Sequence, residues 1–121
     1  MADHNDTGKQ GEALALEHLR QLGWSIEAEN WRYSRSEVDI IAKEGPVLVF
    51  VEVKTRSTDY FGKPETFINQ RKQQMLARAA SAYMEFTQHD WEIRFDVISI
   101  VLVDGRPPEI RHLRDAFFPG L

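Results

Sequence analysis

The segment VLVFVEVKTR at residues 47–56 restricts the fold more than any other stretch of this chain. Positions 47–51 are all apolar, and the β-branched valines among them are typical of a β-strand. A strand that is apolar on both faces has to be covered on both faces, so we expect a layer on each side of its sheet. Its charged end, with Glu52 and Lys54, either runs into solvent or is held at a defined place.

The pattern along the rest of the chain predicts a helix, three strands, a second helix and one or two further strands. TGKQ at residues 7–10 has the form of a capping box that begins the first helix, and Gly23 ends that helix. The second helix lies within residues 64–86 and begins near Asn69. The expected strands are 24–33, 37–42, 47–54, 91–105 and 109–113, with a polar loop at 32–36. This order predicts an α/β fold with a mixed central sheet of about five strands flanked by two main helices.

Each predicted helix carries an apolar stripe that we expect to face the sheet. The stripes are Ala15, Leu16, Leu19 and Leu22 in the first helix, and Leu76, Ala79, Ala80 and Tyr83 in the second. DAFFPG at residues 115–120 is an apolar tail that we expect to dock on the body of the protein. Residues 1–6 are predicted to be a disordered N-terminus, and residues 7–121 a single domain.

Composition narrows the class of protein. Without cysteine, neither a disulfide framework nor a thiolate metal site can form, and the four histidines show no ligand spacing to one another. The sequence lacks a leader-like N-terminus and a long apolar run, which predicts a cytoplasmic protein that does not enter membranes. A net charge of −4 argues against a general nucleic-acid coat protein. A local basic face is still expected, because lysines and arginines are frequent between Arg32 and Arg78.

Pairing the second and third strands across a short loop sets Asp39 opposite Phe50 and Glu37 opposite Glu52. Asp39, Glu52 and Lys54 then share one face of the sheet. Diagonal neighbours lie about 7–8 Å apart, so the carboxylates of Asp39 and Glu52 can converge on one cation. Lys54 is close enough along the strand to act on a water or phosphate oxygen held there. The charged end of the central strand is therefore a candidate catalytic site.

An Asp on one strand followed by Glu-x-Lys at the end of the next resembles the PD-(D/E)XK nuclease signature. The wider pattern resembles the YraN family of largely uncharacterised bacterial proteins, close to the archaeal Holliday junction resolvases. The matching motifs span Gly8 to Phe118 and are GKQGEALALEHL, ENWR, EVDIIA, VFVEVKTR, FGKP, AASAYM, RFDVISI and RHLRDAF. The resemblance implies a restriction-endonuclease-like fold and a Mg²⁺ cofactor for which Mn²⁺ substitutes.

The resemblance also implies a role for each site residue. Asp39 and Glu52 are the metal-binding carboxylates, and the backbone carbonyl of Val53 adds a ligand. Lys54 orients the attacking water and stabilises the charge that develops on phosphorus. Glu12 matches the family's helical Glu, which reaches the metal through water or binds a second ion. The alternative for Glu12 is an exposed first-turn residue that the helix dipole favours.

Basic residues around this site are expected to bind the phosphates of a nucleic acid. They are Arg32, Arg35, Arg56, Arg71 and Lys72. Lys72 has an alternative reading, in which it only extends along the apolar stripe of its helix to reach solvent. Arg94 and Asp96 share one strand face, and we expect them to form a structural ion pair.

These patterns favour a Mg²⁺-dependent DNA endonuclease that hydrolyses phosphodiester bonds, on branched or structured DNA. The alternative is a catalytically silent nucleic-acid-binding module on a nuclease-like fold. A third reading treats the polar cluster as a structural ion network in an interaction protein. Resolvase-like relatives act as dimers, which makes a homodimer a further expectation.

Overall fold

The computed structural model describes residues 4–57 and 68–119 of the chain. Its elements follow the predicted order. They are α1 (His4–Gln21), β1 (Ser25–Tyr33), β2 (Ser36–Glu44), β3 (Val47–Arg56), α2 (Gln70–Thr87), β4 (Ile93–Val101) and β5 (Glu109–Leu113). The predicted fold class, a mixed five-stranded sheet with two main helices, is confirmed. The FGKP motif lies outside the described residues.

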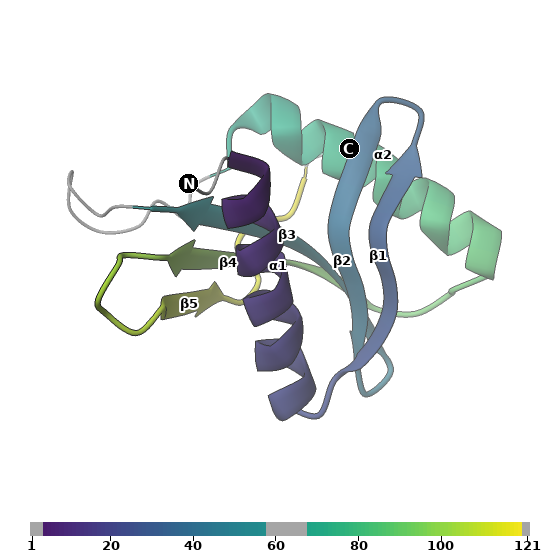
Figure 1. Ribbon diagram of the computed structural model, residues 1–121. Coiled ribbons are helices and arrows are strands. Elements are labelled where there is room, and N and C mark those ends of the chain that lie inside the picture. Colours follow the sequence, from purple (N-terminus) through teal and green to yellow (C-terminus); the bar gives the residue numbers. More distant parts are fainter. Residues whose placement is uncertain (1–3, 58–67, 120–121) are drawn as a thin grey trace.

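The sheet has the strand order β1-β2-β3-β4-β5 (Figure 1). Strands β1, β2 and β3 form an antiparallel meander, β4 runs parallel to β3, and β5 is antiparallel to β4. The parallel pair arises because α2 lies between β3 and β4 in the chain and provides the crossover that parallel strands require. The longest strand, β3, lies in the middle of the sheet.

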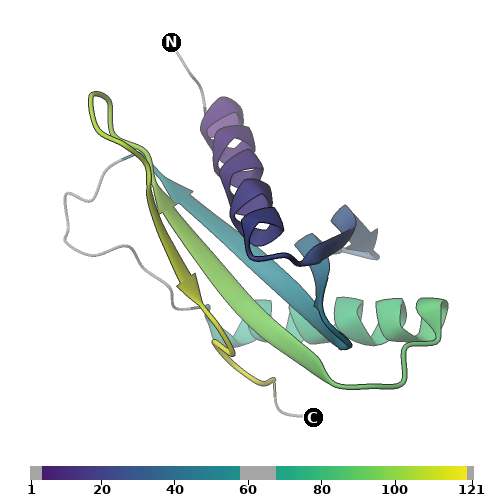
Figure 2. The same cartoon turned by 90° about the horizontal axis from the view of Figure 1, so that it is seen from below.

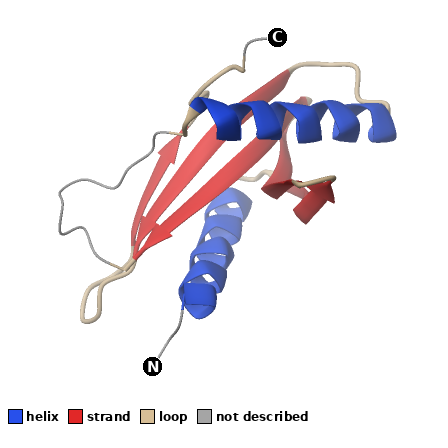
Figure 3. Ribbon diagram, turned by 90° about the horizontal axis from the view of Figure 1, so that it is seen from above, coloured by secondary structure: helices blue, strands red, loops and turns tan. Residues whose placement is uncertain are grey.

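The two helices cover opposite faces of the sheet, as Figures 2 and 3 show. In β3, Leu48 and Phe50 belong to the hydrophobic cluster beneath α2. Val49 and Val51 belong to the cluster beneath α1. This confirms the two-sided burial that the uninterrupted apolar run predicts. Because successive side chains of a strand alternate, it also assigns Glu52 and Lys54, which follow this apolar run, to the face of Leu48 and Phe50.

The ends of the helices only partly match the sequence prediction. Helix α1 begins at His4, so Thr7 lies inside it and the predicted capping-box start is wrong. The preceding turn supplies partners for the N–H groups that a cap at Thr7 would have satisfied. At the other end the prediction is confirmed, because Gly23 has φ +85° and bonds from Gly23 N to Arg20 O (2.9 Å) and from Trp24 N to Leu19 O (3.1 Å) close the helix.

Two further details concern single residues of the helices. Leu22 was expected in the buried stripe but is 46% exposed, because the helix ends at Gln21. In α2, Asn69 is the N-cap, and its side chain accepts a hydrogen bond from Lys72 N at 2.9 Å. The stripe predicted for α2 is buried in full.

The predicted register between β2 and β3 is wrong by two residues. Ile41 lies opposite Phe50, and Glu44 opposite Val47. The reason is the turn, since β2 continues to Glu44 and only Gly45 and Pro46 connect the strands. Gly45 adopts φ +59°, a left-handed conformation that this short turn requires. A shift by an even number of residues leaves the side chains of the paired segments 40–44 and 47–51 on their predicted faces.

The β1–β2 connection is also shorter than predicted, because Ser34 and Arg35 alone form the turn and Arg32 lies within β1. The C-terminal tail docks as expected. Ala116 N donates to Phe95 O at 2.8 Å, and the ring of Phe117 stacks on that of Phe95 with centroids 5.2 Å apart. Within the part of the chain that the structure describes, no helix is long and apolar enough to cross a membrane.

Candidate active site

Asp39 lies where β2 and β3 separate. The last paired residues toward this end of the strands are Ile40 and Val51. One residue further, the side chain of Asp39 takes over the bond that the strand would have made, and its Oδ2 accepts from Val53 N at 2.8 Å. Its carboxylate is therefore fixed against the Glu52–Lys54 segment of β3. The correction to the register brings Asp39 nearer to Glu52 than the diagonal placement that the sequence predicted.

Glu52 is a buried carboxylate with too few partners. Its side chain is 12% exposed, and its Oε2 lies 3.5 Å from Lys72 Nζ of α2. The other oxygen, Oε1, is buried and receives no hydrogen bond from an N–H or hydroxyl donor of the described residues, while the carboxyl of Asp39 lies within hydrogen-bonding reach of Glu52. Burial, followed by repulsion from Asp39, raises the pKa of Glu52 to about 7 although Lys72 opposes the shift. Such a group favours a cation or a proton beside it.

A third carboxylate, that of Glu12 in α1, lies close enough to Asp39 for their charges to interact. Partial burial and the negative charge of Asp39 raise the pKa of Glu12, while a hydrogen bond with the Asn30 side chain opposes the shift. Burial likewise raises the pKa of Asp39, against the opposing bond from Val53. The structure thus brings Glu12 within electrostatic reach of Asp39, as the resemblance implied. Three acids on three elements all bind protons more readily than usual.

Gly11 determines how closely α1 approaches β3 at this point. A Cβ atom at Gly11 would lie 2.8 Å from Cβ and Cγ2 of Thr55 and would overlap Oγ1 of the same residue. The next residue in the helix is Glu12, and Thr55 follows Lys54 in the strand. Only glycine therefore allows the close packing that holds the acid of α1 next to the acids of the sheet.

Two lysines provide positive charge at the site. Lys54 is half-buried and lies on the same face of β3 as Glu52, because two residues separate them. Lys72 was expected to bind phosphate, yet the structure places its ammonium group on Glu52. Its position four residues before the buried Leu76 was the sequence signal that it faces the sheet.

The arginines expected to bind nucleic acid fall into separate places. Arg35 and Arg71 line one cavity together. Arg32 forms an exposed ion pair with Glu37 across the β1–β2 hairpin, with Nε and Oε2 3.0 Å apart. Arg56 ends β3, where its backbone carbonyl accepts a hydrogen bond from Leu102 N at 2.7 Å. The structure therefore does not gather all of them on one surface patch.

The donor set at this site fits a hard divalent cation only in part. Within residues 4–57 and 68–119, no group of three or more His, Cys, Asp or Glu side chains is arranged to hold a metal ion. Asp39 and Glu52 offer two carboxylates, with an unsatisfied oxygen on Glu52. Mg²⁺ commonly binds proteins through one or two carboxylates, with water and substrate phosphate oxygens as its other ligands. The pair therefore fits Mg²⁺ bound in that manner rather than in an all-protein cage.

A family model described as "Uncharacterised protein family UPF0102" matches residues 11–100. The chain belongs to the UPF0102 family. This confirms the YraN family membership predicted from the sequence motifs. A UPF0102 protein of Christiangramia forsetii is 47% identical over 118 residues, which cover 98% of each chain. A UPF0102 protein of Porphyromonas gingivalis is 48% identical over 118 residues, which cover 97% of this chain and 87% of that relative.

One solved structure is also similar to this UPF0102 chain. It is that of Hjc, a Holliday junction resolvase from the archaeal hyperthermophile Archaeoglobus fulgidus. The TM-score is 0.49 at 15% sequence identity, and the match covers 85% of this chain and 74% of that one.

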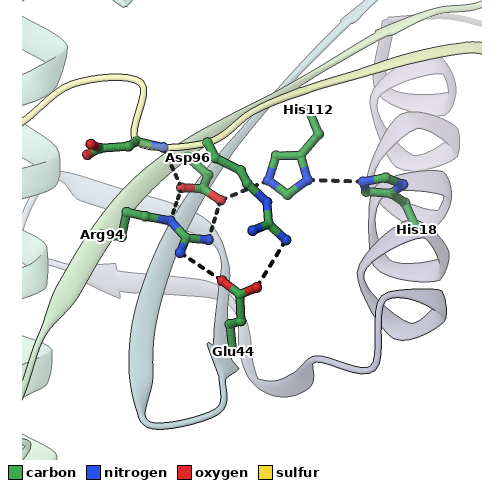
Figure 4. A network of polar contacts seen from close by, with 7 residues as sticks. His18, Glu44, Arg94, Asp96 and His112 are labelled. Atoms are coloured by element: carbon green, nitrogen blue, oxygen red, sulfur yellow. Dashed lines mark hydrogen bonds and ion pairs between the residues drawn. The ribbon is translucent and has the colours of Figure 1, made fainter.

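Another buried acid, Asp96, lies on the face of the sheet beneath α1 (Figure 4). Its Oδ1 accepts from Arg94 Nε (2.8 Å) and Asp115 N (3.0 Å), and its Oδ2 interacts with Arg94 Nη2 (3.0 Å) and His112 Nε2 (2.8 Å). The predicted Arg94–Asp96 ion pair is confirmed. Burial alone would raise the pKa of Asp96, but these hydrogen bonds outweigh it and lower that pKa.

The network extends from Asp96 to both sides. Arg94 Nη1 contacts Glu44 Oε1 at 2.7 Å, and His112 Nδ1 lies 3.0 Å from His18 Nε2 of α1. The sequence gave no signal for the contact between the two histidines, which lie 94 positions apart. Their juxtaposition depends on β5 and α1 meeting on one face, which spacing along the chain does not reveal.

Proposed function

We propose that this protein is a Mg²⁺-dependent DNA endonuclease that hydrolyses phosphodiester bonds. The observation that carries the proposal is the pair of buried carboxyl groups of Glu52 and Asp39, in which Glu52 Oε1 receives no hydrogen bond from an N–H or hydroxyl donor of the described residues. Two buried like charges are costly unless a cation or a proton compensates them. The resemblance of Asp39, Glu52 and Lys54 to the PD-(D/E)XK signature supports phosphodiester hydrolysis as the reaction.

The residues have distinct roles in this proposal. Asp39, oriented by Val53 N–H, and Glu52, oriented by Lys72, would hold the metal together with the Val53 carbonyl. When bound, Mg²⁺ supplies Lewis acidity and lowers the pKa of a bound water. Lys54 is placed on the same strand face to stabilise the negative charge that develops on the phosphate.

Glu12 would contribute to the site from α1. Its carboxylate carries a raised pKa and lies near that of Asp39. We assign it the outer position, where it orients a water molecule or binds a second ion. The proposed substrate is branched or structured DNA, and a homodimer would place two such sites on one junction.

One observation favours a second candidate, a catalytically silent nucleic-acid-binding module. The Lys72 ammonium group lies 3.5 Å from Glu52 Oε2, so it already supplies part of the positive charge that a metal would bring. In that case the acids would be a structural cluster, and basic residues would bind the phosphates. Metal binding and turnover separate the two candidates.

The test is cleavage of labelled DNAs, including duplex, single strand and a four-way junction, with Mg²⁺ or Mn²⁺. We expect Lys54→Ala to lower the cleavage rate by about 10²- to 10³-fold while Mg²⁺ binding, measured by calorimetry, persists. Asp39→Asn should weaken both cleavage and metal binding. Asp104→Asn removes an exposed carboxylate in the β4–β5 turn and serves as the matched control.

Metal binding without cleavage of any substrate by the parent protein would favour the silent module. Cleavage that persists in both Asp39→Asn and Lys54→Ala would remove this site from the mechanism. A symmetric pair of cuts in the four-way junction would support the homodimer.

A further inference from the structure

An open cavity of about 530 Å³ lies between the β1–β2 turn and α2. The residues of its lining that matter here are Tyr33, Ser34, Arg35, Ser36, Arg71 and Arg78. Three of them are arginines, and no acidic side chain lines the cavity. We call this cavity the arginine groove. Its volume is within the range of about 300–1,000 Å³ that ligand pockets occupy.

The arginines of this groove are available to a ligand. All three are exposed, and none forms an ion pair with any residue that the structure describes. By contrast, Arg94 is committed to Glu44 and Asp96 in the network under α1. Arg71 and Arg78 are seven residues apart and therefore lie on one side of α2, with Arg35 opposite them on the turn. This arrangement fits a ligand with several negative charges in a row.

An aromatic ring borders the same groove. Tyr33 is 49% exposed, and its ring is almost parallel to that of Trp31, at an interplanar angle of 5°. A second cavity of about 560 Å³ shares Tyr33 and Arg78 with the groove and continues along α2 to the exposed ring of Phe86, and one acidic residue, Glu85, also lines it. Unpaired bases stack on such rings while the neighbouring arginines hold their phosphates.

The groove and the candidate active site are built on the same two elements, β2 and α2. Arg71 immediately precedes Lys72, whose ammonium group contacts Glu52. Ser36 begins β2, three residues before Asp39. A chain of phosphates bound along the groove would therefore lead toward the two carboxylates.

We propose that the arginine groove binds a single, unpaired nucleic-acid strand, with a base stacked on Tyr33 and phosphates on Arg35, Arg71 and Arg78. The assignment rests on the proposed function for its choice of polyanion. It adds to that function a substrate class, namely nucleic acid with an unpaired segment next to the bond to be cut.

The experiment measures binding without cleavage. Fluorescence anisotropy would follow a labelled oligothymidine of about 15 nucleotides, and a duplex of equal length, in EDTA over a range of salt concentrations. We expect the parent protein to bind the single strand more tightly than the duplex. Tyr33→Ala should weaken single-strand binding about tenfold, and Tyr33→Phe should retain it because stacking needs only the ring.

Arg78→Ala should lower affinity and reduce the slope of log affinity against log salt by about 0.7, the value for one phosphate contact on a single strand. Arg20→Ala, which removes an exposed arginine from α1, is the matched control and should bind like the parent. Unchanged binding by both Tyr33→Ala and Arg78→Ala would overturn the inference, as would a parent that binds no oligonucleotide or prefers the duplex.

Failure of the inference and failure of the proposed function give different results. If the groove variants bind the oligonucleotide normally while cleavage depends on Asp39, the proposed endonuclease function is supported and strand binding in the arginine groove is contradicted. If Tyr33→Ala and Arg78→Ala lose binding but no preparation cleaves DNA, strand binding in the arginine groove is supported and the proposed endonuclease function is contradicted.

Discussion

Two buried acids on the two faces of one sheet reach opposite protonation behaviour. Asp96 is fully buried, yet its two oxygens have four donors and its pKa is lowered. Glu52 is nearly as buried, but one of its oxygens has no N–H or hydroxyl donor among the described residues, and its pKa is raised to about 7. Burial is therefore common to both sites, and the supply of donors distinguishes them. A satisfied acid stabilises a fold, whereas an unsatisfied one is ready for a ligand.

The largest effect should come from removing the charge of Asp96. Asp96→Asn keeps the shape of the side chain but removes the buried one of the two carboxylates that pair with the guanidinium of Arg94, which costs about 3–5 kcal/mol of unfolding free energy. Urea denaturation at neutral pH measures this loss. Because the pKa of Asp96 is lowered in the folded state, its stabilisation is present at neutral pH and disappears as the pH falls through that lowered pKa.

The difference between Asp96→Asn and the parent protein should therefore shrink in acid. A loss below about 1 kcal/mol at neutral pH would show that the network under α1 is worth no more than a surface pair. Asp96 would then not be the stabilising structural acid with which Glu52 is contrasted.

Glu52→Gln should change the unfolding free energy in the opposite direction from Asp96→Asn, because it should stabilise the protein at high pH. A carboxyl with a raised pKa binds its proton more tightly in the folded state, so the parent loses stability as the pH rises from about 4.5 to 7. Glutamine has no such loss, and we expect the variant to be more stable by about 1–3 kcal/mol at pH 8 and equal at pH 4. Urea denaturation in EDTA at both pH values measures the difference.

Asp104→Asn is again the matched control, because its carboxylate is exposed in the β4–β5 turn. A Glu52→Gln protein that is less stable than the parent at pH 8 would mean that Glu52 is a satisfied structural acid like Asp96. Mg²⁺ should restore stability to the parent and not to the variant.

The smallest effect concerns Lys72. Its ammonium group holds down the pKa of Glu52, so Lys72→Met should raise that pKa above 7 and change the unfolding free energy by less than about 1 kcal/mol. NMR titration of the side-chain carboxyl carbons measures the shift. An unchanged pKa would leave burial and Asp39 as the whole cause and would weaken the case for a silent module.

The alternation of side chains along a strand predicted the layers of the fold and the residues of the candidate site, although the predicted strand register was wrong. Alternation along β3 assigned each side chain to a face, and a register shifted by two residues did not change those faces. The turn itself was harder to predict, because a two-residue and a four-residue connection are both compatible with Gly45 and Pro46. Asp39 and Glu52 were therefore placed correctly on one face, although at the wrong separation.

Contacts between distant segments were less accessible from sequence. Lys72 was identified as a residue near the site, but its bond to Glu52 depends on how α2 crosses the sheet. The contact of His18 with His112 requires both α1 and β5 to be in place. Arg78 was counted only among the basic residues expected to form a basic face, and Tyr33 was not singled out, since a groove exists only once the turn and the helix face each other.

The close contact of Gly11 with Thr55 has a consequence for how mutations at this site should be interpreted. A side chain at position 11 would push α1 away from β3, and would increase the distance between Glu12 and the carboxylates of the sheet without changing any of these acids. Selection for weaker or stronger ion binding could therefore act through a residue that never touches the ion. Gly11 thus sets the distance between α1 and β3, and with it the distance between Glu12 and the carboxylates of the sheet.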